Sequence, residues 1–330
     1  MNTKIIDCTL RDGGHATGWD FSLECVKDSY QAAAKAGVDF FEIGYRFQNP
    51  DRNWGEFAKC NDDLLMNLID VRPECKISVM AEAGKSTAED FRICDRDLTI
   101  ISLVRVSSYS HNLDKAFELC EKLHKKGYEV YLNLMAISEY KNEDFEKIRD
   151  WENASFLGAI YFADSFGTFE PDDIEKYYNI LKSYGFENIG LHSHNNLQLA
   201  FANTLRAIKL NFYSVDVSIY GMGRDAGNLP AEILTGYLNK KGLNYNPVPY
   251  IDVIKKYYLD LFNQNPWGYH VKSLIGGLKN VHPTYITELF KQDLPIERTW
   301  EIADEVKKNA PISFDEEALS KIIKKILIYS

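Results

Sequence analysis

The sequence alternates between short hydrophobic runs and amphipathic segments over its first two thirds, and this repeat limits the folds open to it more than any other feature. Eight runs rich in β-branched and aromatic residues begin on average about 30 residues apart, which is the length of one βα unit. Repeated βα units predict a parallel sheet covered by helices. We predict strands that begin near Lys4, Phe40, Lys76, Leu98, Glu129, Leu157, Asn188 and Tyr213.

The segments between these strands carry the end signals of helices. Residues 25–37 and 118–127 finish on lysine and glycine, and residues 171–185 begin with a proline and two acids. The eight units are complete by Gly242, and a (β/α)8 barrel needs roughly 250 residues. We therefore predict an α/β fold, a (β/α)8 TIM barrel over residues 1–242. A doubly wound open sheet is the alternative.

The remaining residues, 243–330, predict a helical C-terminal extension or small second domain. Polar, proline-containing stretches separate its hydrophobic segments. The predicted helices of this region lie at residues 251–262, 282–290, 298–306 and 316–327.

Composition excludes several classes of protein. The 330 residues carry 48 acidic and 38 basic side chains and a net charge of −10, without a basic stripe, so nucleic-acid binding is not expected. No apolar run reaches the length of a membrane span, and the N-terminus has no signal sequence. The six cysteines are dispersed and never form a CxxC pair, which argues against a disulfide framework or zinc ribbon. We expect a cytoplasmic protein.

The first polar cluster, DCTLRDGGH at residues 7–15, follows the first predicted strand. Catalytic groups of a βα barrel lie at the C-terminal ends of its strands, so this position favours function. On that interpretation Asp12 binds a metal, Arg11 stabilises developing negative charge, and His15 moves a proton. The alternative is a surface turn beside a salt-bridged arginine.

The second cluster is His192-Ser193-His194, at the end of the seventh predicted strand. Alternate residues of a strand face the same side, so the two imidazoles point toward one ion. Imidazoles combined with a carboxylate suit a divalent cation and leave positions open for substrate. Two asparagines follow, and Asn196 is a candidate for the substrate-binding or supporting shell.

The third cluster is the glycine-rich loop GMGRDAGN, residues 221–228, after the eighth predicted strand. A dinucleotide-binding loop would need a different glycine spacing, a place at the start of the repeat series and an acid about 20 residues further on. The loop lacks all three. A close approach of its backbone to the metal site explains the glycines better.

A fourth group consists of acids and a serine near other strand ends. Asp164 and Ser165 follow the sixth predicted strand and Glu42 lies in the second, where they could orient the histidines or Arg11. Helix capping is the alternative for Asp164 and Ser165. Asp7, from the first cluster, joins this group, whereas Cys8 lacks the partner that a metal ligand needs.

Together these motifs resemble the DRE-TIM metallolyase superfamily, and within it most closely the 4-hydroxy-2-oxovalerate aldolases. DCTLRDGGH, LHSHNN and GMGRDAGN follow strands one, seven and eight in the order of this superfamily. The resemblance implies Asp12, His192 and His194 as metal ligands, with Asn228 approaching the same metal. It also implies Arg11 as the cation that stabilises an enolate, and Mn²⁺ or Mg²⁺ as the cofactor.

His15 distinguishes the subgroup, because the aldolases carry a residue and then histidine after RDG, as Gly14-His15 does. The resemblance also implies a catalytic tyrosine from the C-terminal part, for which Tyr269 is the candidate and packing the alternative. Asn195 departs from the aldolases, which continue HxH with another histidine. The loops of the acceptor pocket could supply Tyr45, Arg46, Arg105, Ser107 and Tyr109.

The implied activity is metal-dependent cleavage or formation of a 4-hydroxy-2-oxo acid through a pyruvate enolate, with release or uptake of an aldehyde. A Claisen-type enzyme acting on acyl-coenzyme A is the first alternative. A non-catalytic barrel that serves as an assembly module is the second. The implied partners are a small 2-oxo acid and an aldehyde. An acylating aldehyde dehydrogenase and a second copy of the chain, in a homodimer, are further candidates.

Overall fold

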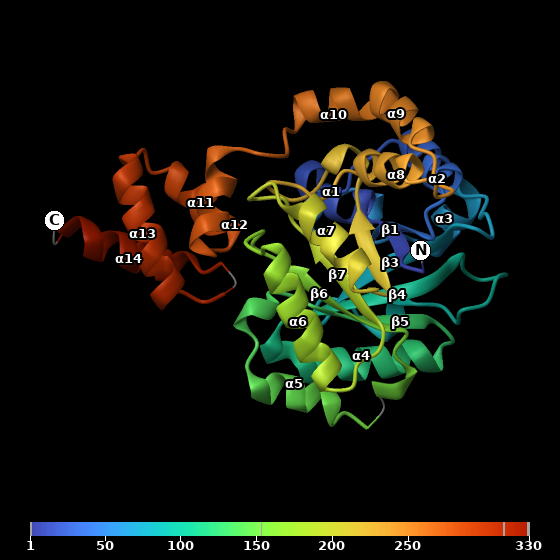
Figure 1. The fold of residues 1–330 in the computed structure, drawn as a ribbon, viewed down its shortest axis with the longest axis horizontal. Helices are drawn as coiled ribbons and strands as arrows, with labels where there is room; N and C mark the ends of the chain where they lie inside the picture. Colours follow the sequence, from blue (N-terminus) through green and yellow to red (C-terminus); the bar gives the residue numbers. More distant parts are fainter. Residues whose placement is uncertain (1, 153, 313, 329–330) are drawn as a thin grey trace.

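The computed structural model describes residues 2–152, 154–312 and 314–328. Eight parallel strands close into one barrel in chain order, which confirms the predicted (β/α)8 fold and excludes the open sheet (Figure 1). The strands are β1 (Lys4–Asp7), β2 (Phe40–Tyr45), β3 (Lys76–Glu82), β4 (Ile101–Ser108), β5 (Glu129–Leu134), β6 (Ala159–Asp164), β7 (Ile189–Ser193) and β8 (Ser214–Val217).

Most strands begin within a residue of the predicted position, and the two exceptions have local causes. Before β4, the amides of Leu98 and Thr99 donate to the carbonyl of Asp95, so these residues form a turn. Before β6, the amide of Leu157 donates to the carbonyl of Ala154 in the same way. In both places a local hydrogen bond competes with the strand ladder.

Helices surround the barrel, with one addition and one omission relative to a regular repeat. An extra helix, α1, directly follows β1, and only a short 3₁₀ turn joins β3 to β4. The helices are α1 (Thr9–Thr17), α2 (Leu23–Ala36), α3 (Asp62–Leu68), α4 (Leu113–Lys125), α5 (Asn142–Arg149), α6 (Pro171–Ser183), α7 (Ala200–Lys209) and α8 (Ala231–Lys240). The 3₁₀ turns are η1 (Glu56–Ala58), η2 (Ala88–Asp90), η3 (Ser110–Asn112), η4 (Ile137–Glu139), η5 (Ala154–Phe156) and η6 (Ile219–Gly221).

The C-terminal region has two parts. A nearly continuous helix, α9 (Val248–Val253), η7 (Ile254–Tyr258) and α10 (Leu259–Gln264), packs on the barrel. The hydroxyl of Tyr250 donates to the Asp7 carboxylate at 2.8 Å, and the hydroxyls of Tyr258 and Ser29 are 2.7 Å apart. This segment shares the hydrophobic core of the barrel.

The second part is a bundle of four helices beside the barrel, shown in red and orange in Figure 1. These helices are α11 (Val271–Lys279), α12 (Pro283–Phe290), α13 (Ile296–Asn309) and α14 (Glu316–Ile328). They have a hydrophobic core of their own, which includes Tyr285 and Leu289. The sequence predictions did not include α11, which contains the Gly276-Gly277 pair. The predicted division after residue 242 stays a prediction, and the two cores lead us to propose a division after Trp267.

The interior of the barrel has two layers because alternate side chains of each strand point inward. The lower layer is hydrophobic and consists of Ile6, Phe40, Leu103, Tyr131, Ala159 and Tyr161. Two residues further along, Glu42, Arg105 and Asp216 form a charged layer. The charged layer lies nearer the C-terminal ends of the strands, where a βα barrel places its active site. None of the described helices has both the length and the hydrophobicity to cross a membrane.

Candidate metal centre and active site

The first motif forms a helix, so the surface-turn alternative is wrong. β1 ends at Asp7 and α1 begins at Thr9, which places Arg11 and Asp12 on the first turns of a buried helix. The glycines of DGG allow close packing. A Cβ on Gly14 would lie 2.1 Å from the Trp19 ring, and one on Gly13 would lie 2.7 Å from the sulfur of Met222.

Three predicted metal ligands meet at the top of the barrel. Asp12, His192 and His194 are buried, and one ligand atom from each lies within 4.8 Å of the others. The Nε2 atoms of both histidines are buried and have no hydrogen-bond partner in the part of the chain that the structure describes. Leaving a buried polar atom unpaired costs free energy, so this pair of nitrogens fits a bound cation.

The Nδ1 atoms of the two histidines fix the tautomers. Nδ1 of His192 lies 2.8 Å from Oδ2 of Asp216, and Nδ1 of His194 lies 2.9 Å from the carbonyl oxygen of Asp164. Both partners are acceptors, so each Nδ1 carries the proton and each Nε2 has a free lone pair. Metal-binding histidines are held by partners of this kind.

Asn228, which the resemblance implies as a further ligand, lies beside Asp12. Its Nδ2 donates to Oδ2 of Asp12 at 2.8 Å, while its Oδ1 is buried and finds no hydrogen-bond partner among the residues described. The glycine loop passes close to the ligands, because a Cβ on Gly223 would lie 2.6 Å from the same carboxylate oxygen. The expected close backbone approach is therefore present.

The charges of the ligand group suit a divalent cation. Burial disfavours ionisation of Asp12, but Arg11, His194 and His192 hold the pKa of its carboxyl well below its usual range. Burial and the neighbouring His192 lower the pKa of His194 to about 3. One carboxylate and neutral imidazoles are the ligands that metals such as Mn²⁺ accept.

A second group of potential ligands, Cys8, His192 and Asp216, lies beside the first. It fits a metal less well. Burial raises the pKa of the Cys8 thiol well above its usual value, and Nδ1 of His192 is already paired with Asp216. Cys8 therefore stays protonated, in keeping with its expected role as a bystander.

Arg11 belongs to a buried network of alternating charges. Its Nε donates to Glu42 at 2.8 Å and its Nη1 to Asp12 at 2.6 Å. Arg105 binds the same Glu42 through its Nε at 2.7 Å and binds Asp216 through Nη1. Glu42 thus holds the guanidinium of Arg11 in place, and its supporting role in the site stays a prediction.

Two members of this network have roles that the sequence predictions did not assign. Arg105 is fully buried in the middle of β4. It does not lie in a loop of the acceptor pocket, where we expected it. Asp216 was not singled out, although a lone acid in the strand SVDV is a recognisable signal. Arg46, which the sequence analysis placed in the pocket for the acceptor substrate, forms a buried ion pair with Asp62 at 2.9 Å.

His15 stands on α1, at the mouth of the barrel, between aromatic rings. Its ring centroid lies 4.8 Å from that of Trp19 and 6.0 Å from that of Tyr45. The residue is exposed to solvent, and desolvation by the packed rings lowers the pKa of its imidazole despite the nearby Asp12. The imidazole is therefore neutral at pH 7 and able to accept a proton.

Asp7 lies apart from the metal ligands. It alternates with the inward-facing Ile6, so its side chain points out of the barrel, where it accepts hydrogen bonds from Thr9 and Tyr250. Burial raises the pKa of Asp7 to about 6. The structure thus shows it supporting the connection from β1 to α1 rather than the metal site.

Asp164, Ser165 and Asn196 support loops around the site. The Asp164 carboxylate accepts the amides of Thr168 and Phe169, and it is the backbone carbonyl of Asp164 that holds His194. The hydroxyl of Ser165 accepts the amide of Ala136 at 2.8 Å. Nδ2 of Asn196 donates at 3.1 Å to the carbonyl of Ser273, a residue of the C-terminal bundle.

The structure does not bring Tyr269 to the metal ligands. Its side chain is 58% exposed, on the segment between α10 and α11. The residues on either side of it do contact the glycine loop, because His270 pairs with Asp225 at 2.9 Å and Gly268 donates to the Asp225 carbonyl. The catalytic role of Tyr269 stays a prediction.

Comparison with known proteins agrees with this geometry. The HMGL-like family matches residues 2–248. A 4-hydroxy-2-oxovalerate aldolase from Carboxydothermus hydrogenoformans is 30% identical over 241 residues, 72% of this chain and 71% of that protein. The solved N-terminal domain of a Bacteroides vulgatus protein, provisionally assigned as an aldolase, is 29% identical with a TM-score of 0.79, covering 87% of this chain and 96% of that one.

The Bacillus subtilis HMG-CoA lyase structure shares the fold at 16% identity, with a TM-score of 0.64 over 79% of this chain and 94% of that one. The chain therefore belongs to the HMGL-like family, the DRE-TIM group that its motifs resemble. It is an enzyme of the aldolase type within that family.

Proposed function

We propose that this protein is a divalent-metal-dependent aldolase that cleaves or forms a 4-hydroxy-2-oxo acid. The observation that carries the proposal is the set of unpaired buried atoms beside Asp12, namely both histidine Nε2 atoms and Oδ1 of Asn228. A stable fold without a ligand has little reason to leave three such atoms unsatisfied in one place. The names of the curated relatives support the choice of an aldol reaction.

Asp12, His192, His194 and Asn228 would hold the cation, which we propose to be Mn²⁺ or Mg²⁺. When bound, such a cation supplies Lewis acidity toward the ketone of a 2-oxo acid. The chain supplies the rest. Arg11 is fixed by Glu42 and Asp12, so its positive charge is already in place when the enolate of pyruvate develops negative charge.

His15 is the proposed base. In the cleavage direction it accepts the proton of the hydroxyl on carbon 4, and the bond between carbons 3 and 4 breaks. The electron pair passes to carbon 3, an aldehyde leaves, and protonation of carbon 3 yields pyruvate. A neutral imidazole at the mouth can perform this step because it opens to the substrate side.

Proton exchange on pyruvate tests the enolate. The protein is incubated with Mn²⁺ and pyruvate in deuterated water, and the methyl protons are followed by NMR. We expect exchange in the wild type and a loss of about 10²–10³-fold in Arg11→Lys, because a displaced cation stabilises the enolate poorly. Absence of exchange in the wild type would falsify the proposal.

Substitution of His15 tests the base. We expect His15→Ala to lose cleavage of 4-hydroxy-2-oxovalerate while it still binds Mn²⁺ in calorimetry, since His15 is not among the ligands. Thr17→Ala, a change near the end of the same helix, is the matched control. The acyl-coenzyme A alternative predicts instead that coenzyme A thioesters are turned over and that hydroxy-oxo acids are not.

A further inference from the structure

Arg224 differs from the other arginines around the barrel mouth. Arg11, Arg46 and Arg105 are each paired with a buried carboxylate. Arg224 forms no ion pair with any residue that the structure describes. Its Nη2 lies 3.4 Å from the carbonyl oxygen of Ser165, a long contact with a neutral group. Its positive charge is therefore not neutralised, in a protein whose net charge is −10.

The second contact of Arg224 is with His282, the residue that caps the N-terminus of α12. Nη1 of Arg224 lies 3.4 Å from Nε2 of His282, while Nδ1 of His282 accepts the amide of Thr284. Because Nδ1 is the acceptor, the neutral imidazole carries its proton on Nε2. A donor of His282 thus faces a donor of Arg224, and neither can satisfy the other.

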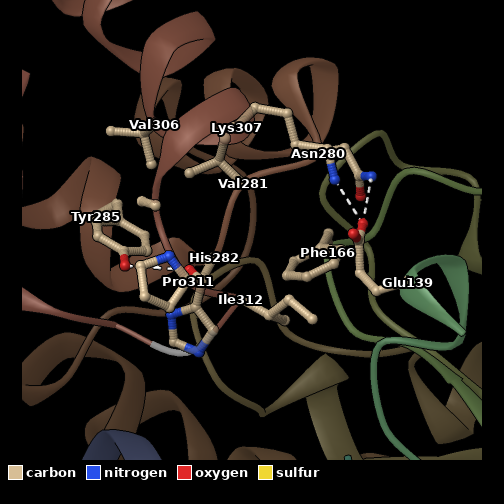
Figure 2. A pocket seen from close by; sticks show the side chains of 11 residues that line it. Glu139, Phe166, Asn280, Val281, His282, Tyr285, Val306, Lys307, Pro311 and Ile312 are labelled. Atoms are coloured by element: carbon tan, nitrogen blue, oxygen red, sulfur yellow. Dashed lines mark hydrogen bonds and ion pairs between the residues drawn. The ribbon is translucent and has the colours of Figure 1, made fainter. Parts of the chain in front are cut away.

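Two converging donors without an acceptor form a site for an oxyanion. Both side chains are partly exposed, so a ligand can reach them. The site joins the barrel to the C-terminal bundle. Figure 2 shows His282 at the edge of a small cavity between Phe166 and Glu139, which belong to the barrel, and the helices that carry Tyr285 and Lys307.

The backbone of Arg224 relates this site to the metal centre. Its amide donates to Oδ2 of Asp12 at 3.2 Å, while its guanidinium extends to His282 of the bundle. The guanidinium charge is therefore separated from the metal ligand Asp12 by the length of the Arg224 side chain. A substrate that binds at the ligands and extends toward the bundle would bring its far end to this guanidinium.

We propose that Arg224 and Nε2 of His282 bind an anionic group on the aldehyde portion of the substrate, so that the enzyme acts on aldehydes bearing a carboxylate or a phosphate. This inference rests on the proposed aldolase function and adds its substrate class. It also gives the C-terminal bundle a role, because the bundle supplies one of the two donors.

Aldehydes matched in size test the proposal. The full chain with Mn²⁺ and pyruvate is assayed with succinic semialdehyde, glycolaldehyde phosphate and butanal. We expect kcat/KM for at least one anionic aldehyde to exceed that for butanal by about tenfold or more, as a charge-assisted hydrogen bond provides. Comparison of succinic semialdehyde with glycolaldehyde phosphate shows whether a carboxylate or a phosphate is preferred. Equal or better use of butanal overturns the proposal.

Two variants locate the preference. In Arg224→Gln, the ratio of kcat/KM for the anionic aldehyde to kcat/KM for butanal should fall toward one. The fall should come mainly from a higher KM for the anionic aldehyde. His282→Asn keeps an acceptor for the Thr284 amide, but its shorter side chain places its own N–H donor further from Arg224, so this variant should lose part of the preference. Arg298→Gln, the same substitution at a partly exposed arginine of α13 that pairs with Glu301, should keep the wild-type preference. An unchanged ratio in Arg224→Gln overturns the proposal.

Other outcomes separate the remaining explanations. If Arg224 holds the carboxylate of pyruvate instead, Arg224→Gln raises the KM of pyruvate in the exchange assay while the aldehyde ratio persists, and the proposal fails. If the wild type exchanges no pyruvate protons, the aldolase function fails, and calorimetry with succinate and with inorganic phosphate decides the anion site. Binding that weakens in Arg224→Gln supports the site, and absence of binding overturns it.

Discussion

The two layers inside the barrel solve the problem of filling a closed sheet in opposite ways. The lower layer is filled by aromatic and aliphatic side chains, among them Tyr131 and Tyr161 with stacked rings 5.9 Å apart. The upper layer is filled by charges, with Arg105 between Glu42 and Asp216. The upper layer adjoins two buried nitrogens, Nε2 of His192 and Nε2 of His194, that have no hydrogen-bond partner among the described residues. The lower layer therefore contributes to stability alone, whereas the upper layer also borders the candidate metal ligands.

The largest effect should come from removing a ligand above the charged layer. We expect His194→Ala to lose Mn²⁺ binding and to lower aldol turnover by about 10³-fold or more, beyond the 10–100-fold that outer-shell partners contribute. Calorimetry and turnover measure the two effects. Ser193→Ala, one residue earlier on the opposite face of β7, is the control and should keep both. Metal binding that survives in His194→Ala would remove His194 from the site.

The next effect concerns the charged layer itself. Arg105→Met leaves Glu42 and Asp216 buried with less positive charge, and breaking a buried ion pair costs about 3–5 kcal/mol. Urea unfolding measures the loss. The exposed Arg298→Gln should change the free energy of unfolding by about 0.5 kcal/mol at most. If the two variants were equally stable, the charged layer would not contribute to folding.

How far the sequence predicted this arrangement depends on whether the partners of a residue are local. Asp12 and His194 stand in short motifs that follow strands, so the sequence alone made them candidates for the site. Asp216 binds His192 across two adjacent strands, and His282 meets Arg224 only because the bundle folds against the barrel. Neither contact has a local signal. His282 before a proline indicates no more than a helix cap.

Asp7 shows how a correct motif can mislead. It belongs to the first cluster, and we expected it among the residues that bind substrate or support the metal site. The alternation of β1 places Ile6 inside the barrel, so Asp7 faces the helices and binds Tyr250. The alternation of side chains along the strand could have revealed this, because Asp7 must point outward when its neighbour Ile6 points inward.

This outward position has a measurable consequence for pH dependence. Burial raises the pKa of Asp7 from 3.8 to about 6, so the folded state holds its proton more tightly than the unfolded state. The stability that the neutral carboxyl contributes is present below pH 3.8 and is lost as pH rises through 6. Between pH 4.5 and 7 the loss is about 2 kcal/mol.

Asp7→Asn should lack this loss, so its stability relative to the wild type should improve by the same amount over that pH range. Urea unfolding of both proteins at pH 4.5 and pH 7 gives the difference, and comparing the two proteins cancels the titration of all other groups. A constant difference across the range would mean that Asp7 is ionised in the fold throughout.

The smallest effect should come from the lower layer. Tyr161→Phe removes a hydroxyl that donates to Ser214 and keeps the ring that lies 4.8 Å from the Arg105 guanidinium. Loss of one neutral hydrogen bond costs about 0.5–1.5 kcal/mol. The metal ligands do not contact this hydroxyl, so turnover should stay within a factor of two of the wild type. A tenfold fall in turnover with intact folding would show that the boundary between the layers does not separate stability from catalysis, because a change below the charged layer would then have reached the metal site through Arg105 and Asp216.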